Sequence, residues 1–264
     1  MTYRPRSHLS APPWGWAVAG ALAGLLMAVL LFAPARWLAS ALEQASAGRV
    51  QLTNARGTVW SGTAQLIFTG GAGSRDATAL PGALNWQIRP HAGQLLVSVY
   101  ASCCTPQPLR LQLRPRWGGI TLDFSDDQSN WPAQLLAGLG TPWNTVHPAG
   151  QLALSSQGLS LDLIEGRVAI TGHVRLDAID LSSRLSTLRP LGSYRLTLQG
   201  GASPVLELAT ISGSLQLTGN GRWIGSRLYF DGKAFAAPER EDALSNLLNI
   251  IGRRNGAQSI ISLG

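Results

Sequence analysis

Cysteine, histidine and lysine are scarce in this 264-residue chain, and the shortages exclude several classes of protein. Two cysteines cannot build a disulfide scaffold, and together with four histidines they offer no obvious structural zinc cluster. Charged residues make up only 13%, too few for a coiled coil, whereas 45% apolar residues are too many for a disordered chain. Lys233 is the single lysine, so the net charge of +7 rests on arginine. Thirty glycines and fifteen prolines are abundant by contrast, and they predict the many turns of an all-β chain.

One apolar stretch is long enough to cross a membrane. Residues 14–32 carry no charge, and at about 1.5 Å per residue they reach roughly 28 Å, close to a bilayer core of about 30 Å. Arg4 and Arg6 precede the stretch and Arg36 follows it, so the positive-inside rule predicts a cytoplasmic N-terminus. We expect a cytoplasmic tail over 1–13, a transmembrane anchor over 14–33, a short periplasmic helix or linker over 34–48, and a periplasmic β-rich domain over 49–264.

A cleaved signal peptide is the competing interpretation, because residues 33–35, Ala-Pro-Ala, resemble a cleavage site. The apolar stretch exceeds the usual signal-peptide core of about 7–15 residues, and Pro34 lies inside the proposed site. We therefore favour an uncleaved anchor. A mature protein that begins at Arg36 would contradict this interpretation.

Helical periodicity occurs at few places beyond the anchor. An amphipathic helix is predicted within 34–48, since Leu38, Leu42 and Ala45 share one face and Gly48 can end it. After residue 48 we expect at most two helices. The weaker is one or two turns over 134–139.

The stronger helix is predicted over 238–251. Pro238 suits its first turn, Gly252 is expected to cap its end, and Arg253 and Arg254 suit the negative pole of the helix. Its apolar face is formed by Leu244, Leu247, Leu248 and Ile251.

Beyond residue 49 the dominant period of the apolar residues is two. Leu109, Leu111 and Leu113 alternate with polar neighbours, as in a half-buried strand with one apolar face. A last short strand is predicted over 259–263. Many short strands predict a mainly β fold, with one curved, twisted antiparallel sheet. The alternation recurs at 152–154, 159–163, 196–198, 206–208, 215–217 and 228–230, and turns are predicted at 70–71, 81–82, 118–119, 148–150, 200–201 and 219–221.

A weak internal repeat accompanies the strands. Residues 166–176 align without gaps on 213–223, and 57–66 fit the same outline with one residue fewer. Each unit is interpreted as a strand kinked at glycine, and such strands curve a sheet. Coincidence among Gly- and Leu-rich strands is the alternative explanation.

Several sequence blocks resemble the type II secretion system protein N family of Gram-negative bacteria. The blocks follow a single N-terminal anchor, and their order and spacing span nearly the whole chain. They are Arg-Gly-Thr-Val-Trp-Ser-Gly at 56–62, Leu-Asn-Trp-Gln-Ile-Arg-Pro at 84–90, Tyr-Phe-Asp-Gly at 229–232, the acidic helix start after Pro238, and Leu-Leu-Asn-Ile-Ile-Gly-Arg-Arg at 247–254.

The resemblance implies a bitopic inner-membrane protein that is accessory to export of folded proteins across the outer membrane. It implies no enzyme activity, no catalytic residues and no cofactor. The implied partners are other inner-membrane platform subunits and, as a further candidate, the outer-membrane secretin. More distantly, an anchor followed by a curved sheet is similar to AsmA-like envelope proteins, which handle lipid. A protein that binds or shuttles lipid along an apolar groove is therefore the alternative function.

No constellation of residues in the sequence predicts catalysis or metal binding. His91, His147 and His173 are far apart and lie near predicted turns or strand ends. Asp126 and Asp127 are adjacent, so on an extended segment they point to opposite faces and are expected to cap a nearby helix or to be solvated. The glycine-rich segment at 70–74 lacks the lysine of a phosphate loop and is interpreted as a flexible hairpin loop.

Cys103 and Cys104 are adjacent in what we expect to be an oxidising compartment. Their Cα atoms, about 3.8 Å apart, lie below the usual disulfide window of about 4.4–6.8 Å. A redox-active bond between neighbours, a strained staple of the turn, and two free thiols remain as alternatives.

Tryptophan and arginine mark the candidate surfaces. The tryptophans could line an apolar groove for a lipid chain or a partner strand, although core packing is the favoured interpretation. Arg110, Arg114 and Arg116 cluster, but the other arginines alternate along strands, so we expect contact with acidic lipid head groups or proteins and not with nucleic acid. The tryptophans in question are Trp60, Trp86, Trp117, Trp131, Trp143 and Trp223.

Overall fold

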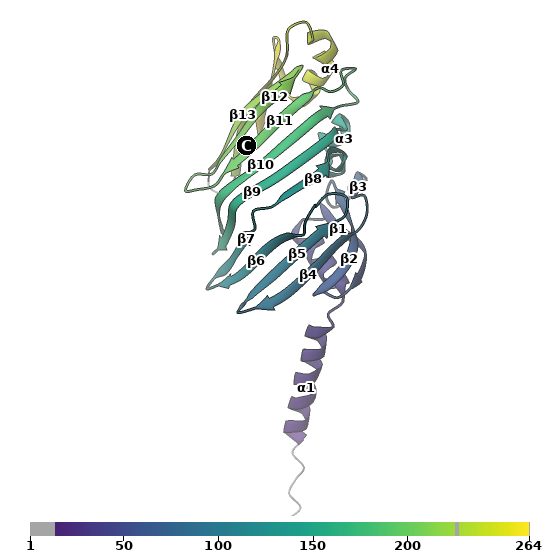
Figure 1. Ribbon diagram of the computed structural model, residues 1–264, viewed down its shortest axis with the longest axis vertical. Helices are drawn as coiled ribbons and strands as arrows, with labels where there is room; N and C mark the ends of the chain where they lie inside the picture. The colour runs from purple at the N-terminus through teal and green to yellow at the C-terminus, as the bar shows by residue number, and fades with distance from the viewer. Residues whose placement is uncertain (1–13, 225–226, 264) are drawn as a thin grey trace, which may run out of the picture.

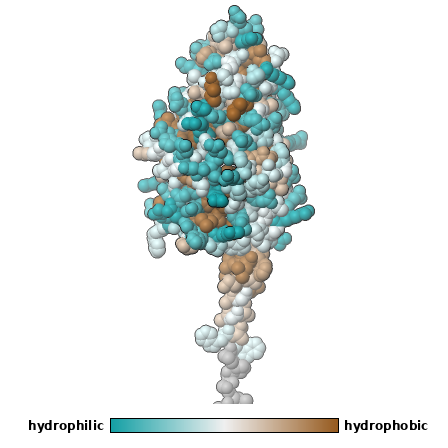
Figure 2. All heavy atoms as spheres, in the orientation of Figure 1, coloured by the Kyte–Doolittle hydropathy of each residue, from teal (hydrophilic) through white to brown (hydrophobic). Residues whose placement is uncertain are grey.

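The computed structural model describes residues 14–224 and 227–263 (Figure 1). The predicted tail over 1–13, with Arg4 and Arg6, lies outside them. An apolar helix, α1 (Trp14–Leu31), stands apart from the rest of the chain and buries none of its residues against it. Among the described residues it is the one helix long and apolar enough to cross a membrane. Its length and apolar composition make it a candidate membrane span (Figure 2).

The second helix, α2 (Ala35–Ala45), begins directly after Pro34 and occupies the middle of the predicted segment. Proline suits a helix start because it lacks the amide proton that would be unpaired there. Ala35 is buried, and Leu38 and Leu42 pack with it against the first strands. The amphipathic pattern therefore corresponds to a helix that packs on the sheet.

Within the described residues, sixteen strands form one antiparallel sheet, which confirms the predicted fold class. The strands follow one another nearly in chain order from β1 at one edge to β15 at the other, so the sheet is open. The strands are β1 (Val50–Gly57), β2 (Ser61–Thr69), β3 (Ala77–Ala79), β4 (Leu84–His91), β5 (Gln94–Ala101), β6 (Leu109–Arg116), β7 (Gly119–Phe124), β8 (Gln128–Pro132), β9 (Ala149–Ile164), β10 (Arg167–Ser182), β11 (Gly192–Gln199), β12 (Val205–Gly213), β13 (Leu215–Ile224), β14 (Arg227–Ala236), β15 (Arg253–Asn255) and β16 (Gln258–Leu263).

The strand register sorts the side chains onto two faces. Leu111 lies opposite Val97 on one side and Phe124 on the other, so the apolar positions of β5, β6 and β7 form rows. The intervening positions are polar, as where Gln112 lies opposite Asp123. We call these the apolar face and the polar face of the sheet. The period-two alternation of the sequence produces both, because neighbouring residues of a strand point to opposite sides.

Helices cover the apolar face at its two ends and create two cores. The N-terminal core joins α2 and the 3-10 helix η1 (Ala133–Leu139) to the first strands, around Leu66, Leu80 and Trp86. The C-terminal core joins α4 (Glu241–Ile251) to the last strands, around Leu215, Leu244 and Leu247. Figure 1 shows α4 at the end of the sheet farthest from α1.

The prediction of a turn at 219–221 is wrong. These residues lie inside β13, paired with β14 throughout. The glycines provide space for an aromatic ring: a Cβ atom on Gly219 would lie 2.4 Å from Cζ of Phe230. Glycine at these positions therefore reflects the close approach of an aromatic side chain and not a reversal of the chain.

Helix positions differ from the prediction in two places. The C-terminal helix begins at Glu241 instead of Pro238, because Glu239 has a positive φ of 63° in a turn closed by the Arg240 amide and the Ala237 carbonyl. Gly252 is extended, with φ −172°, so it does not cap in a left-handed conformation. Arg253 and Arg254 belong to β15. A third helix, α3 (Trp143–Val146), was not predicted and is one turn long.

The predicted kink at glycine is confirmed in one of the three aligned segments. In β10 the register shifts around Gly172, which has φ 86° and faces Gly158 of β9 with φ 55°. This bulge joins the runs 152–154 and 159–163 into one sixteen-residue strand. Segment 213–223 forms a regular ladder beyond Leu215, and 57–66 contains a turn between β1 and β2. The three segments therefore do not form equivalent structural units.

Candidate interaction surface

The three histidines within the described residues lie in separate parts of the fold. His91 ends β4, and His147 follows α3 in a left-handed conformation with φ 44°. His173 lies within β10, so its predicted place near a strand end is wrong. Across 14–224 and 227–263, no three His, Cys, Asp or Glu side chains are grouped so that they could hold a metal ion.

Asp126 and Asp127 stabilise the point where β9 changes its partner strand from β7 to β8. Asp126 Oδ1 accepts the Gly158 amide at 2.6 Å, and Asp127 Oδ2 accepts the Arg110 amide at 3.1 Å. The carboxylates cap no helix, which corrects that expectation. They bind two different backbone segments, and such contacts suit a structural role better than a paired acid and base.

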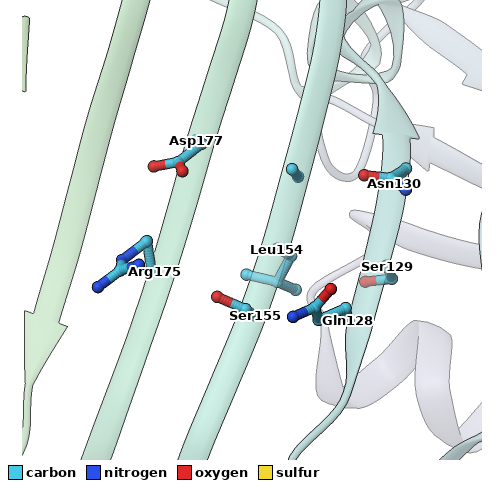
Figure 3. Close-up of a pocket in the computed structure, with 8 residues that line it drawn as sticks. Gln128, Ser129, Asn130, Leu154, Ser155, Arg175 and Asp177 are labelled. Carbon is cyan, nitrogen blue, oxygen red and sulfur yellow. The ribbon is translucent and has the colours of Figure 1, made fainter. Parts of the chain in front are cut away.

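A shallow depression on the polar face is lined by Gln128, Ser155, Arg175 and Asp177 from three adjacent strands (Figure 3). Its volume of about 200 Å³ is below the roughly 300–1,000 Å³ of a typical small-molecule site. Its carboxylate is already engaged: Arg195 Nε and Nη2 donate to Asp177 Oδ1 and Oδ2 at 2.7 and 2.8 Å.

The hydrogen bonds from Arg195 hold the pKa of the Asp177 carboxyl below its usual range, and the nearby charge of Arg175 acts in the same direction. The pKa of Arg195 is raised in turn. A general acid or base works best with a pKa near the operating pH, and the shift of Asp177 is away from neutrality. The depression therefore holds an ion pair of the sheet surface.

Cys103 and Cys104 are joined by a disulfide in the turn between β5 and β6. Cys104 is buried in the N-terminal core, whereas Cys103 is exposed. The Cys104 amide donates to the Ala101 carbonyl at 2.9 Å, and its carbonyl accepts the Asn130 amide of β8 at 2.8 Å. Of the alternatives left open, the free thiols do not occur, and the pair staples a turn that β8 packs against.

The tryptophans do not share one groove. Trp86 is buried in the N-terminal core and donates from Nε1 to the Val59 carbonyl at 3.0 Å, and Trp131 is half-buried beside it. Core packing is right for these two. Trp117 is 102% exposed in the turn between β6 and β7, and Trp143 is 39% exposed on α3. The Gly-Gly that follows Trp117 is the sequence signal that could have placed it at a hairpin tip.

The middle of the apolar face lies between the two helix-covered cores, and its residues belong to neither core. Its leucines are half-buried, in contrast to the fully buried leucines at either end of the sheet. We call this region the central apolar face: Leu111, Leu113, Leu122, Leu161, Leu196 and Leu198. Contiguous apolar side chains that remain partly exposed on a folded protein are typical of interaction sites.

The two free edges of the sheet differ. Strand β15 has three residues and ends the sheet with exposed Arg253 and Arg254, which oppose the addition of another strand. Strand β1 has eight residues, an irregular register around Asn54, and α2 packed beside it. Both edges are therefore protected, which leaves the central apolar face as the candidate interaction surface.

The sequence comparisons identify the family. The family model described as Type II secretion system (T2SS), protein N matches residues 48–261, from just before β1 into the last strand. No curated protein and no solved structure matches the chain. The match contains all the sequence blocks that carry the resemblance, and it contains the whole central apolar face. The chain belongs to the type II secretion system protein N family.

Proposed function

We propose that this protein is a non-enzymatic accessory component of the type II secretion machine whose sheet docks onto other secretion subunits through the central apolar face. Family membership supports the accessory role. The docking role rests on one observation: both ends of the apolar face carry helices and buried cores, while its middle carries half-buried leucines. Burial of such a surface against a partner would supply about 25 cal/mol per Å² of apolar area.

The proposed location is the inner membrane, with α1 as an uncleaved span, the N-terminus in the cytoplasm and the sheet in the periplasm. The charge bias around α1 supports this orientation. The disulfide between Cys103 and Cys104 supports it as well, because disulfides persist in the periplasm and are rare in the cytosol. The candidate partners are the inner-membrane platform subunits and the outer-membrane secretin, because both would face the periplasm.

Photocrosslinking in native membranes tests the docking proposal. A photoreactive residue would replace Leu198 on the central apolar face, and the matched control would replace Thr197. Both side chains are half-buried in β11, but they point to opposite faces. We expect adducts to secretion subunits from position 198 and few from 197. Equal adducts from the two positions, or no protein adduct from either, would contradict docking at this face.

Lipid handling is the second candidate function, and one observation favours it. The apolar rows continue from the N-terminal core to the C-terminal core without a polar row between them, so an acyl chain could lie across several strands. The same crosslinking experiment separates the candidates. Adducts at position 198 dominated by phospholipid would replace docking with lipid binding as the function of the central apolar face.

A further inference from the structure

The end of the anchor is fixed to the sheet by hydrogen bonds. Trp60 Nε1 donates to the Leu30 carbonyl at 2.7 Å, and the Val59 amide donates to the Ala33 carbonyl at 2.8 Å. Pro34 and Thr58 form an isolated antiparallel bridge beside them. A flexible linker would lack such contacts, so the direction of α1 sets the direction of the sheet. Whatever membrane surrounds α1, the same side of the sheet faces it.

Two hairpin ends lie on that side. Figure 1 shows the arrowheads of β4 and β6 directed toward the end of the molecule that carries α1. The turn after β4 is at 92–93, and the turn after β6 is formed by Trp117 and Gly118. Strands β4 to β7 are held in one hydrogen-bonded sequence, so both ends approach the membrane side as one rigid unit.

The side chains at these ends are those that favour a membrane interface. Trp117 is 102% exposed and buries nothing against the protein. Arg116 and Arg89 are exposed beside the turns, and Ile120 is 41% exposed at the start of β7. We call these four residues the tip patch. Tryptophan concentrates at the membrane–water interface, and arginine extends its charge to anionic head groups while its carbon chain stays in apolar surroundings.

The neighbouring β9–β10 turn also carries exposed apolar and basic side chains. Leu163 lies opposite Ile120, and Val168 lies opposite Leu163; they are 42% and 62% exposed. Glu165 is the acidic residue of this turn, and its amide donates to the Gly118 carbonyl at 3.1 Å. With Arg89, Arg116 and Arg167 around it, the basic charge exceeds the acidic charge at the tips.

We propose that the tip patch is a second membrane contact, in which Trp117 enters the interface of the bilayer that holds α1. The occupant is the bilayer because the anchor end and the tips lie on one side of a rigid unit, and because the tips combine an unburied tryptophan with arginines. The contact fixes the tilt of the sheet relative to the membrane. The proposed contact does not depend on which secretion subunit is the partner, or on the direction in which α1 crosses the membrane.

The test uses the full chain in vesicles of phosphatidylethanolamine and phosphatidylglycerol with brominated acyl chains. An environment-sensitive fluorescent amino acid would replace Trp117 in one variant and Trp143 in the control variant. Trp143 is also exposed, but α3 lies on the part of the sheet away from α1 (Figure 1). We expect the bromolipid to quench the probe at 117 and to leave the probe at 143 unchanged, relative to vesicles without bromine.

Three outcomes would overturn the proposal. They are no quenching at position 117, equal quenching at 117 and 143, and quenching at 117 that disappears when the protein is diluted among the vesicles. The last result would show that the lipid contact requires a second copy. Circular dichroism of each variant confirms that the sheet is intact. Because the Leu198 experiment reports on a different surface, the tip proposal and the docking proposal can fail separately.

Discussion

The ring of Phe230 requires glycine at two neighbouring positions, one in β13 and one in β14. Hypothetical Cβ atoms on Gly219 and Gly232 would lie 2.4 and 2.9 Å from the ring, closer than carbon atoms approach. Phe230 itself is 7% exposed, so the ring has little room to move. The glycines and the aromatic side chain therefore form one packed unit within β13 and β14.

Replacing Gly219 by alanine should destabilise the sheet. The new methyl group would displace the buried ring, and overpacking of a well-filled core costs about 1–3 kcal/mol. Urea unfolding of the full chain in detergent would measure the change in the free energy of unfolding. The control is Asn220→Ala, at the next position on the polar face, where the side chain is exposed. A loss no greater for Gly219→Ala than for Asn220→Ala would refute the packing explanation.

Tryptophan shows what a single residue type can and cannot reveal. Trp86 lies two residues before Ile88 in a strand with alternating apolar positions, so its place on an apolar face could be predicted. Trp117 follows the last residue of β6, outside the alternation, and its exposure depends on the absence of any element above the turn. Periodicity determines the face of a strand residue, but whether that face is covered depends on elements distant in the sequence.

Helix α4 completes the C-terminal core, and its importance is tested by one buried residue. Leu247 is 1% exposed and belongs to the same cluster as Tyr194 and Leu215. Leu247→Ala should lower the free energy of unfolding by about 2–5 kcal/mol, because it leaves a cavity as well as losing apolar burial. Hydrogen exchange should show the loss in β11 and β13 first. The control Ile250→Ala, on the same helix but 38% exposed, should cost much less.

Equal effects of Leu247→Ala and Ile250→Ala would show that α4 does not support the core through its buried face. Faster exchange in β1 and β2 to the same extent as in β13 would show that the two cores do not open independently. Either result would contradict the separation of the N-terminal and C-terminal cores.

The helices and strands could be predicted from the sequence with unequal accuracy. The apolar spacing at 244, 247, 248 and 251 sufficed for the buried face of α4, yet its start was misplaced because Glu239 adopts a left-handed turn that the sequence does not signal. Helix α3 is a single turn, too short to show a period. Strand β9 was read as two runs because Gly158 interrupts the alternation, although the bulge keeps the ladder continuous.

At the scale of the whole molecule, the anchor should remain attached. Cleavage after Ala35 would remove the Leu30 and Ala33 carbonyls that accept hydrogen bonds from Trp60 and Val59. Intact-mass measurement of the protein extracted from membranes should therefore show a chain that retains residues 14–33. A chain that begins at Arg36 would demonstrate cleavage, and the sheet would then be released from the bilayer.

The overall architecture followed from alternation and turn signals, and the family from its sequence blocks. The candidate interaction surface followed only in part. Alternation predicts that Leu111 and Leu113 share an apolar face, but the sequence does not show that α2 and α4 stop short of them. Exposure of the middle of the sheet is a property of how far the covering helices reach, which depends on packing between distant segments.

The order of the strands has a consequence for how the molecule is made. Most strands pair with the one that precedes them in the chain. The three exceptions, β4 with β2, β9 with β7 and β16 with β14, each skip a single strand. Contacts between close neighbours in the sequence cost little loop-closure entropy and form quickly. A chain delivered from its N-terminus can thus add each hairpin to a finished edge, beginning at β1. No strand has to wait for a distant partner, so little adhesive edge is left open to aggregation during synthesis.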